Sequence, residues 1–413
     1  MRVLILGASF AGLPAAFRLR RHLPKDCDVT VLDKRDAFTF TPSLIWVPFG
    51  RRSAEQITVP LRPALERRGI EFLQEEALRI EPEHQAVATA SRRIVYDRLL
   101  VATGPSLDFS AVPGLGLEGP AQSLCTLEQA MKARDAWRSF LEDPGPIVIG
   151  GAQRSAFLSA AYEFAFNLDY DLREVYKRRK VEITFLTPEP YLGHLGIGDT
   201  GRARGLLEWF FRHANIDWVV QSVIDQVTPD EVRLGQGSLS RFYERQDKWE
   251  NVSCKGFPFK YAMIMPPMSG AEVVKRSGLG NQDGFIVVDE YMRHKRHPEI
   301  FAAGVSVAVT TPQPSQLASS APKTGYISRV MAKTAARNIA ASLTRRPLVA
   351  RPVLDSSLKL VLDAGDQGLM MFLDHIYQPK PRQRRFFLPG WWAHWAKVSF
   401  EKQYLWKTRA GLA

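Results

Sequence analysis

The stretch RVLILGASFAG, residues 2–12, decides the fold of this chain. Its first part, RVLILG, is a short apolar run typical of a buried parallel β-strand. It continues into Gly-x-Ser-x-Ala-Gly (7–12), a variant of the dinucleotide-binding fingerprint, and then into an apolar helical segment. Gly7 permits the tight turn, and Gly12 permits close packing of helix on strand. Ser9 is small enough for backbone N–H groups to approach a pyrophosphate at the N-terminus of the helix.

A second strand and an acidic residue complete this opening. DVTVLD (28–33) ends on Asp33, about 20 residues after Gly12, where a carboxylate can accept hydrogen bonds from ribose hydroxyls. The order strand, loop, helix, strand and acid predicts a bound dinucleotide; the alternative is an α/β opening that binds none. The first 17 residues also resemble a signal peptide, but the dinucleotide interpretation requires that they be retained.

The same pattern restarts in the middle of the chain. PGPIVIGGAQRSAFLSAAYEF (144–164) again predicts a strand, glycines and a helix, and VEITFLT (181–187) predicts the next strand. Arg154 and Ser155 stand where a third glycine is expected, and the second strand ends on Thr187, which cannot hold a ribose as an acid can. We therefore interpret this unit as a dinucleotide fold without a firmly bound dinucleotide.

Two later segments lead the chain back to the first sheet. YDRLLVATGP (96–105) is predicted to be a strand whose small Thr103 and Gly104 suit a backbone pressed against a cofactor. HPEIFAAGVSVAV (297–309) resembles the strand that completes a flavin site, with Gly304 at its turn, although Val305 stands where such proteins usually have Asp.

A helix is predicted to follow over residues 322–340. Lys323 and Thr324 lie at its N-terminus. The helix dipole and the ammonium group could face the electron-rich edge of a flavin there.

Composition limits the function classes. The 413 residues suffice for two or three packed units, and the net charge of +12 favours an anionic partner. Nucleic acid ranks low because no zinc-finger spacing or RNA-binding aromatic signature accompanies the charge. Cys27, Cys125 and Cys254 are too few and too scattered for a disulfide framework or a metal site. No run of 18 or more apolar residues predicts a transmembrane helix.

The last 26 residues, LPGWWAHWAKVSFEKQYLWKTRAGLA (388–413), carry four of the nine Trp residues. On a helical wheel one arc carries most of the large apolar side chains, with Trp392 at its margin: Trp391, Trp395, Val398, Leu405 and Trp406. Lys397, Glu401 and Thr408 lie elsewhere, and Phe400 and Tyr404 point away from the arc. Trp with Lys and Arg is favoured at a lipid headgroup boundary. The residues alone also allow a helix docked on its own protein.

Taken in order, these segments resemble the sulfide:quinone oxidoreductase family over nearly all of the chain. The stretches that carry the resemblance are GASFAG, FTFTPS (38–43), VATGP, SLCTLEQA (123–130), AAYEFAFNLDYDL (160–172), TPEPYLGHLGIG (187–198), NIDW (215–218), PKTG (322–325), LDAGDQG (362–368) and WAKVSFEKQYLWKTRAG (395–411). EPYLGH and the last stretch are specific, whereas the glycine loop alone is not.

The resemblance implies an α/β fold with two Rossmann-like dinucleotide-binding domains in tandem and a C-terminal amphipathic helical membrane-binding region. The implied boundaries are 1–110 and 296–350 for the FAD-binding domain, 111–295 for the second domain and 351–413 for the quinone- and membrane-binding region. It further implies bound FAD, quinone as electron acceptor, and peripheral attachment to one membrane leaflet without a transmembrane helix. A homo-oligomer is compatible with it.

The resemblance also assigns individual residues. FAD contacts are expected at Gly7, Ser9, Phe10, Ala11, Gly12, Asp33, Lys34, Thr41, Ala77, Thr103, Gly104, Gly304, Lys323 and Gly325. Lys397 matches a lysine near the quinone oxygen, and Phe400 matches an aromatic residue that flanks the quinone. A lysine there could stabilise the negative charge that develops on the quinone oxygen.

The sulfur site departs from the family pattern. Family members oxidise sulfide with cysteines beside the flavin, but Phe157 and Leu360 stand where two of them belong, and neither can hold a persulfide. Cys125, Glu163 and His194 keep their matches and are the catalytic candidates. Cys125 could attack a substrate, attach to the flavin, or be a buried small hydrophobe. The sulfur relay is therefore predicted to be incomplete, which leaves the small-molecule electron donor open, with sulfide among the candidates.

Two other functions compete with a quinone-reducing flavoprotein. A type II NADH:quinone oxidoreductase would need a nicotinamide site, against which the 150–155 loop and Thr187 argue. A non-catalytic membrane-bound binding protein could use the same scaffold without chemistry. Bound FAD that bleaches on reduction would exclude the latter.

Overall fold

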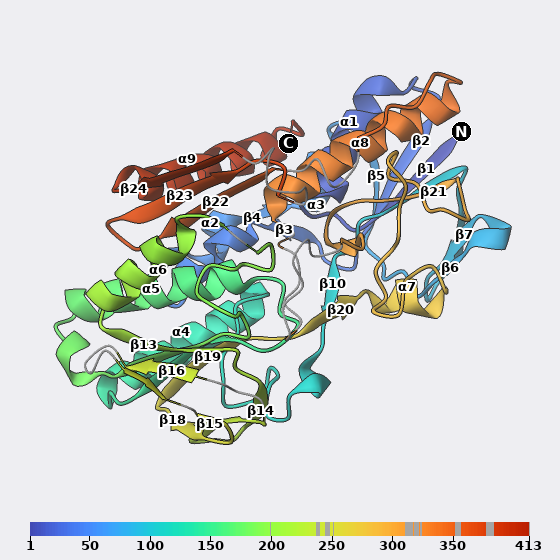
Figure 1. Ribbon diagram of the computed structural model, residues 1–413. Helices are drawn as coiled ribbons and strands as arrows, with labels where there is room; N and C mark the ends of the chain where they lie inside the picture. Colours follow the sequence, from blue (N-terminus) through green and yellow to red (C-terminus); the bar gives the residue numbers. More distant parts are fainter. Residues whose placement is uncertain are drawn as a thin grey trace.

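The computed structural model describes residues 1–198, 200–236, 240–243, 248–250, 252–309, 317, 322, 324–351, 357–376 and 384–412 (Figure 1). Two sheets of parallel strands, each with helices packed on it, form most of the molecule, and the C-terminal helix lies along one side. Among the described residues, no helix combines the length and the hydropathy that crossing a membrane requires.

The first sheet has five strands in the order β21-β9-β1-β2-β5. They are β1 (Arg2–Leu6), β2 (Asp28–Leu32), β5 (Glu71–Leu73), β9 (Arg98–Val101) and β21 (Ile300–Ala302), and every neighbouring pair is parallel. The strand near residue 300 thus joins the sheet built by the first hundred residues, as the sequence predicts. Because all five strands point the same way, the loops after them meet at one edge of the sheet.

Two long helices pack against each other beside this sheet, α1 (Gly12–His22) and α8 (Gly325–Leu343) (Figure 1). Smaller elements cover the remaining edges: β3 (Ala37–Thr39), η1 (Thr41–Trp46), α2 (Ala54–Ile57), β4 (Thr58–Pro60), α3 (Leu61–Glu66), β6 (Arg79–Glu81), η2 (Pro82–His84), β7 (Ala86–Ala88), β8 (Arg93–Val95) and η6 (Gly304–Ser306).

The second sheet has the order β17-β16-β13-β12-β11-β19. Its parallel strands are β11 (Ile147–Gly151), β12 (Ile183–Leu186), β13 (Ile216–Val220) and β19 (Tyr261–Met265), and β16 (Ser240–Tyr243) and β17 (Lys248–Glu250) extend it antiparallel. Its helices are α4 (Leu127–Glu142), α5 (Leu158–Glu174) and α6 (Ala203–His213). This confirms the prediction of a second Rossmann-like unit.

The connections between the two units pair with each other. β10 (Pro105–Leu107) leaves the first unit and β20 (Met268–Gly270) returns to it, and the two form an antiparallel pair. The remaining elements of this region are η3 (Phe109–Ala111), η4 (Arg178–Lys180), β14 (Ile224–Val227), β15 (Glu231–Leu234), β18 (Gly256–Pro258) and α7 (Glu272–Arg276).

The C-terminal region is a three-stranded antiparallel sheet followed by one helix. The elements are β22 (Leu358–Asp363), β23 (Gly368–Leu373), β24 (Arg385–Pro389) and α9 (Trp392–Arg409). The sequence places no barrier to a helix from residue 388, yet Leu388 and Pro389 pair with β23 instead. Gly390, with a φ of +137°, turns the chain from this strand into α9.

The faces of α9 are the reverse of those of an ordinary docked amphipathic helix. Its buried positions include charged and polar residues: Ala393, Lys397, Val398, Glu401, Tyr404, Leu405 and Thr408. Its exposed large side chains are aromatic: Trp392, Trp395, Phe400 and Trp406, with Trp391 just before the helix. α9 is therefore docked on the protein, with Val398 and Leu405 of the arc buried, but not through its Trp side chains, because Lys397 and Glu401 bond to buried partners on the inner face.

Candidate active site

The loop between β1 and α1 leaves no room for side chains at its two glycines. Gly7 has a φ of +97°, and a Cβ atom there would lie 2.3 Å from the backbone oxygen of Ala102. A Cβ atom on Gly12 would lie 1.7 Å from the oxygen of Gly7. These contacts bring the N-terminus of α1 directly onto the end of β1, which is the arrangement that binds a pyrophosphate.

Asp33 follows β2 and is buried beside this loop. Its Oδ2 accepts a hydrogen bond of 2.7 Å from the backbone N–H of Ala8, and Arg35 donates to both of its oxygens. Burial by itself would raise the pKa of Asp33, but the hydrogen bonds and charge of Arg35 and the Ala8 N–H lower it below its usual value. The carboxylate is therefore ionised at neutral pH, as an acceptor for ribose hydroxyls must be.

Two more glycines at the same edge of the sheet lie very close to neighbouring side chains. A Cβ atom on Gly304 would lie 2.9 Å from the Cβ of Ala11, and one on Gly325 would lie 2.8 Å from the ring of Phe10. Gly325 begins α8, so the N-termini of α1 and α8 converge here with their positive dipole ends together.

The end of β9 is fixed at this edge as well. Ser306 accepts a hydrogen bond from the backbone N–H of Gly104 and lies 3.3 Å from the hydroxyl of Thr103. A dinucleotide with an anionic pyrophosphate fits a site built from glycine cradles, two helix N-termini and one ionised acid.

Three expected FAD contacts lie at the rim of this site or outside it, and a fourth is not described. Lys34 is exposed and pairs with Glu76 at 3.0 Å; Thr41 is exposed at the start of η1, and Ala77 is half-buried in the loop before β6. Lys323 lies outside the described residues.

A buried ion pair joins α9 to the second unit. The ammonium group of Lys397 donates to Oε1 of Glu163 on α5, and both residues are buried. Burial raises the pKa of Glu163 to about 7; the charge of Lys397 opposes the rise, and that of Asp363 adds to it. Lys397 Nζ also lies 4.4 Å from the ring centroid of Trp46. A cation and a carboxyl group that titrates near neutral pH are thus held together in a buried position.

Asp363, at the end of β22, extends this pair to the surface. Its backbone N–H donates to Glu163 Oε1 at 2.9 Å, and its carboxylate accepts from Trp46 Nε1 at 2.8 Å. His394 Nδ1 lies 2.7 Å from the other carboxylate oxygen, and this imidazole is partly exposed. Sequence reasoning missed Asp363 and His394. Asp363 lies in LDAGDQG, one of the resembling stretches, whereas His394 directly precedes the last of them.

A second buried carboxylate holds the middle of α9. Glu401, one turn after Lys397, accepts hydrogen bonds from the hydroxyl of Ser43 and from Nε of Arg52. Ser43 belongs to the FTFTPS stretch and Arg52 to the segment that follows it. Sequence reasoning did not find this contact, because the helical wheel shows only that Glu401 lies away from the Trp arc.

Aromatic rings fill the space between the nucleotide loop and α9. Phe10 packs on Phe38, Phe40 and Tyr404 with ring centroids 5.0–5.6 Å apart, and Phe400 lies 5.7 Å from Phe40. Phe400 remains 43% exposed, so one aromatic stack reaches from the dinucleotide loop to the outer surface of α9. Such a stack suits a planar ligand.

The positions where sulfur cysteines are expected are apolar. Phe157 precedes α5, and Leu360 lies in β22. One small enclosed space separates these two segments. Its walls are Ala156, Leu158, Ser159, Leu195, Pro322, Thr324, Leu358 and Leu360. Within the part of the chain that the structure describes, no thiol lines this space, so these residues offer a persulfide no attachment point there.

Cys125 has the environment of an unreactive thiol. Burial raises its pKa to about 12, and its backbone N–H donates to the side-chain oxygen of Gln129. Gln129 completes a capping box with Thr126 at the start of α4, which explains a glutamine at this position structurally.

His194 lies in the loop after β12, and burial lowers its pKa. Its Nδ1 has no hydrogen-bond partner among the described residues. The structure does not bring Cys125 or His194 into hydrogen-bonding contact with Glu163.

In the second Rossmann-like unit, residues of the loop where a nucleotide would bind are bonded to the protein itself. The side chain of Gln153 bonds to both the backbone N–H and the carbonyl of Ile224 at 3.1 Å. Arg154 adopts a left-handed φ of +65° and pairs with Asp283, and α5 begins only at Leu158. The helix N-terminus is therefore withdrawn from the strand end, where a pyrophosphate would bind.

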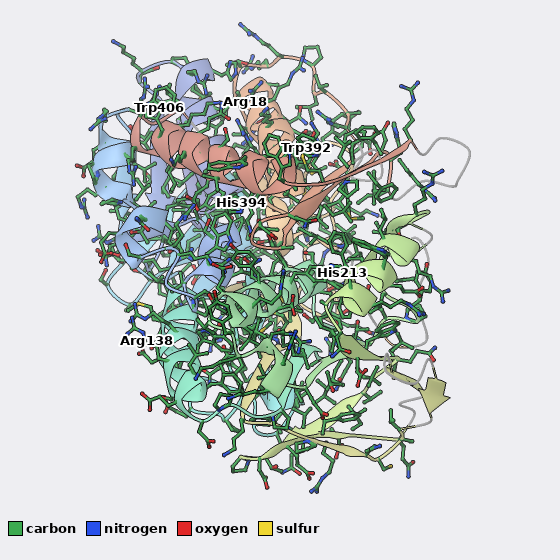
Figure 2. All side chains as sticks on the ribbon, turned by 90° about the vertical axis from the view of Figure 1, so that its left-hand side faces the viewer. Arg18, Arg138, His213, Trp392, His394 and Trp406 are labelled. Atoms are coloured by element: carbon green, nitrogen blue, oxygen red, sulfur yellow. The ribbon has the colours of Figure 1, made fainter. Side chains whose placement is uncertain are left out.

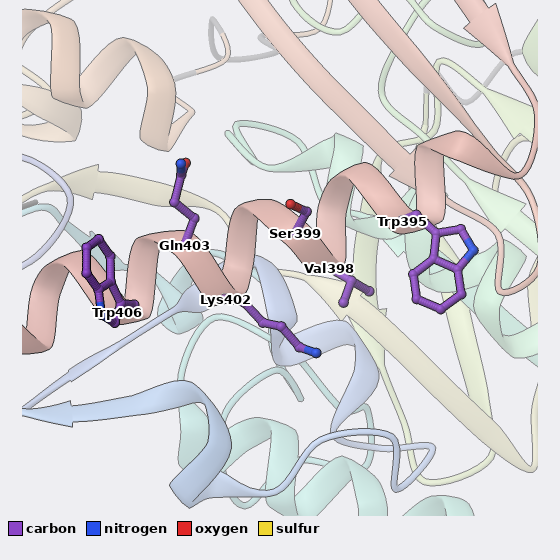
Figure 3. A pocket seen from close by; sticks show the side chains of 6 residues that line it. All are labelled: Trp395, Val398, Ser399, Lys402, Gln403 and Trp406. Carbon is purple, nitrogen blue, oxygen red and sulfur yellow. The ribbon is translucent and has the colours of Figure 1, made fainter.

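The outer face of α9 carries a shallow groove (Figure 3). Its lining residues are Trp395, Val398, Ser399, Lys402, Gln403 and Trp406. Figure 3 shows the two indoles at its ends with Lys402 between them. Trp395 and Trp406 are each 60% exposed, far more than is usual for this side chain.

Comparison with known proteins finds a matching family and several similar proteins. A family model described as pyridine nucleotide-disulphide oxidoreductase matches residues 1–325. The sulfide-quinone reductase of Aquifex aeolicus is 34% identical over 413 residues, covering 99% of this chain and 91% of that protein. The X-ray structure of the sulfide:quinone oxidoreductase from that bacterium aligns with a TM-score of 0.90 at 33% identity, covering 99% of this chain and 92% of its own. The mitochondrial sulfide:quinone oxidoreductase of Mus musculus is 26% identical over 344 residues, covering 80% of this chain and 70% of that protein.

Proposed function

Because the chain belongs to the pyridine nucleotide-disulphide oxidoreductases and, among them, to the sulfide:quinone oxidoreductase family, we propose that the buried charges beneath α9 serve quinone reduction. The protein is an FAD-dependent oxidoreductase that uses quinone as its electron acceptor. FAD supplies two-electron redox chemistry between donor and quinone. The observation that carries the proposal is the Lys397–Glu163 pair, buried next to a partly exposed aromatic stack.

Reduction of a quinone to a quinol consumes two electrons and two protons, so charge and protons must be managed at its oxygens. Lys397 places a buried positive charge where negative charge develops on a quinone oxygen, and Phe400 with Phe40 provides aromatic surface for the ring. Glu163, whose pKa is about 7, supplies a proton from a site that water does not reach directly. Asp363 bonds to Glu163 through its backbone N–H and to His394 through its carboxylate, which places a partly exposed imidazole near the pair.

The pH dependence of quinone reduction tests the role of Glu163. Its protonated form is the proton donor and is present below about pH 7, so the rate should fall as pH rises through that value. Glu163→Gln should remove this limb and leave a slow rate that changes little with pH. Pre-reduced protein is mixed with decyl-ubiquinone in a stopped-flow instrument, with exposed Glu83→Gln as the matched control. An unchanged pH profile in Glu163→Gln would rule out this role.

For the electron donor, the apolar lining around Phe157 and Leu360 argues against the paired-cysteine route. Sulfide oxidation to zero-valent sulfur releases two electrons, and the sulfur must be held as a persulfide or displaced by a second thiolate. Cys125 is the one cysteine kept from the family set, and its high pKa leaves it protonated at neutral pH. The filled loop of the second unit argues equally against a nicotinamide donor.

We expect weak or absent sulfide:quinone turnover in the natural chain. A Phe157→Cys, Leu360→Cys double variant should raise it by at least an order of magnitude, because it restores one thiol in the wall of the space, at 360, and one at 157, between the wall residues Ala156 and Leu158. The control is Phe157→Ser, Leu360→Ser, which opens the same space without sulfur. Rapid turnover by the natural chain that survives Cys125→Ala would refute the argument.

The family resemblance also implies attachment to a membrane, and the exposed face of α9 supports this. We propose that the exposed indoles of Trp391, Trp395 and Trp406 enter the lipid headgroup layer, where Trp is favoured. The quinone, which is dissolved in the membrane, would then reach Phe400 and Lys397 without crossing water.

Replacing these three Trp by Gln should weaken binding to phosphatidylcholine vesicles by two orders of magnitude or more. Each buried aromatic side chain contributes about 1.5–3 kcal/mol, and each 1.4 kcal/mol is tenfold in affinity. Trp209, which is 53% exposed on α6, provides the control as Trp209→Gln. Equal vesicle flotation of the triple variant and this control would show that α9 is not the membrane-binding element.

A further inference from the structure

A group of basic side chains lies where α1 and α8 pack together, outside the site described above. Arg18 on α1 and Arg329, Lys333 and Arg337 on α8 form this group, here called the α1–α8 cation cluster. The three α8 residues are spaced four apart and therefore share one helix face. None of the four makes an ion pair or a side-chain hydrogen bond within the described part of the chain.

The surroundings of the cluster are also positive. Burial is the largest cause that lowers the pKa of Lys333. The positive charges of nearby basic residues lower it further, in the order Arg329, Arg18, Arg351 and Lys407. At the other end of the cluster, burial and then Arg18, Arg21 and Arg337 lower the pKa of His22. The charged groups that chiefly cause both shifts are all basic. Like charges held this close repel one another, which favours an added anion.

Two members of the cluster have unused hydrogen-bond donors. The Nε atoms of Arg18 and Arg329 are shielded from solvent and have no hydrogen-bond partner among the described residues. The guanidinium group of Arg329 lies 6.0 Å from the ring of Tyr404, which places it beside α9. Guanidinium donors held in place are suited to phosphate oxygens.

The cluster adjoins the aromatic surface of α9. Figure 2 shows Arg18 at the same end of the molecule as Trp392 and Trp406, while Arg138 lies towards the opposite end. Lys407, which follows the exposed Trp406 on α9, acts electrostatically on Lys333. The cluster thus lies near the part of α9 that carries the exposed Trp406.

We propose that Arg18, Arg329, Lys333 and Arg337 bind the phosphate group of an anionic phospholipid at the edge of the surface by which α9 contacts the membrane. A lipid is the occupant because the cations border exposed Trp side chains, and basic residues next to interfacial aromatics attract acidic headgroups. This inference rests on the membrane attachment proposed above and adds to it a preference for lipid charge.

The experiment compares flotation of the full-length, FAD-containing protein on vesicles of phosphatidylcholine with and without phosphatidylglycerol. The natural protein should bind the anionic vesicles much more tightly. In an Arg18→Gln, Lys333→Gln, Arg337→Gln variant that preference should fall on the order of 100-fold, because each cation near an anionic surface contributes severalfold to affinity. Arg18→Lys, Arg337→Lys, which keeps the charge, should retain most of the preference.

The control variant removes the same charges from the second Rossmann-like unit, as Arg138→Gln, Arg179→Gln, Lys180→Gln. If this control loses as much preference as the cluster variant, net charge rather than a site is responsible and the proposal fails. A second test adds a competitor, at constant ionic strength, to protein bound to vesicles that contain phosphatidylglycerol. The proposal fails also if inorganic phosphate releases the protein from these vesicles as effectively as an excess of further anionic vesicles does. Binding to phosphatidylcholine alone separates the two proposals: the cluster variant should keep it, whereas the Trp variant should lose it.

Discussion

A Gly12→Leu variant is expected to be isolated without the yellow colour of bound flavin. A Cβ atom at this position would lie 1.7 Å from the oxygen of Gly7, which real Cβ atoms do not approach so closely. The obstructing atom belongs to the backbone of the same tight turn, so no side-chain rotation can relieve the overlap. α1 must move away from β1, and the N–H groups at its N-terminus then no longer converge where the pyrophosphate binds.

The measurement is the flavin absorption of purified protein relative to its protein content, with circular dichroism to confirm folding. Gly205→Leu is the matched control, because Gly205 lies in α6 and a Cβ atom there meets nothing within 4 Å. The control should retain full flavin content. A folded Gly12→Leu protein with full flavin content would refute the assignment of the loop.

Lys397→Met should slow quinone reduction by about 10² to 10³, the usual loss when one preorganised charge-stabilising group is removed. Methionine keeps most of the apolar stem while removing the charge next to Glu163 and above Trp46. Without the ammonium group, burial and the charge of Asp363 raise the pKa of Glu163 further, opposed by the hydrogen bond from the Asp363 backbone N–H. The carboxyl group then stays protonated to higher pH, so the pH limit of the residual rate should move upwards.

The observable is reoxidation of pre-reduced protein by decyl-ubiquinone. Lys402→Met provides the control, since Lys402 is exposed on the same helix and lines the outer groove. It should react at close to the natural rate once the amount of vesicle-bound protein is equalised. A Lys397→Met rate equal to that of Lys402→Met would contradict the assignment of this lysine to the quinone site.

The sequence predicts the parallel sheets well because their signals are local. Apolar runs followed by glycines at 7–12 and 150–151 mark the first strands of both units, and Asp33 and Thr187 mark the strand ends that differ. Gly304 and Gly325 also lie at the predicted edge, because any strand that joins a parallel sheet brings its C-terminal end there. The roles assigned to individual residues remain predictions.

The tail shows where sequence reasoning stops. A helical wheel separates the Trp arc from Lys397 and Glu401, but it cannot tell which face is buried, because this depends on partners distant in sequence. Glu163 lies 234 residues from Lys397, and Ser43 lies 358 residues from Glu401. The links from Asp363 to His394 and Trp46 were missed for the same reason, since each is a tertiary contact between segments that show no periodic pattern.

The division of α9 into a charged inner face and an aromatic outer face also has a practical consequence for handling the protein. The side chains that would demand detergent are separate from those that bond to α5, β22 and the segment around Ser43. Polar residues at 391, 392, 395 and 406 would leave the bonds of Lys397 and Glu401 in place, although they would remove the hydrogen bond from Trp392 Nε1 to the Pro389 carbonyl and the ring contact of Trp395 with His394. A detergent-free form could be made by surface substitution alone, keeping the helix whole and allowing crystallisation or spectroscopy with short-chain quinones added from water.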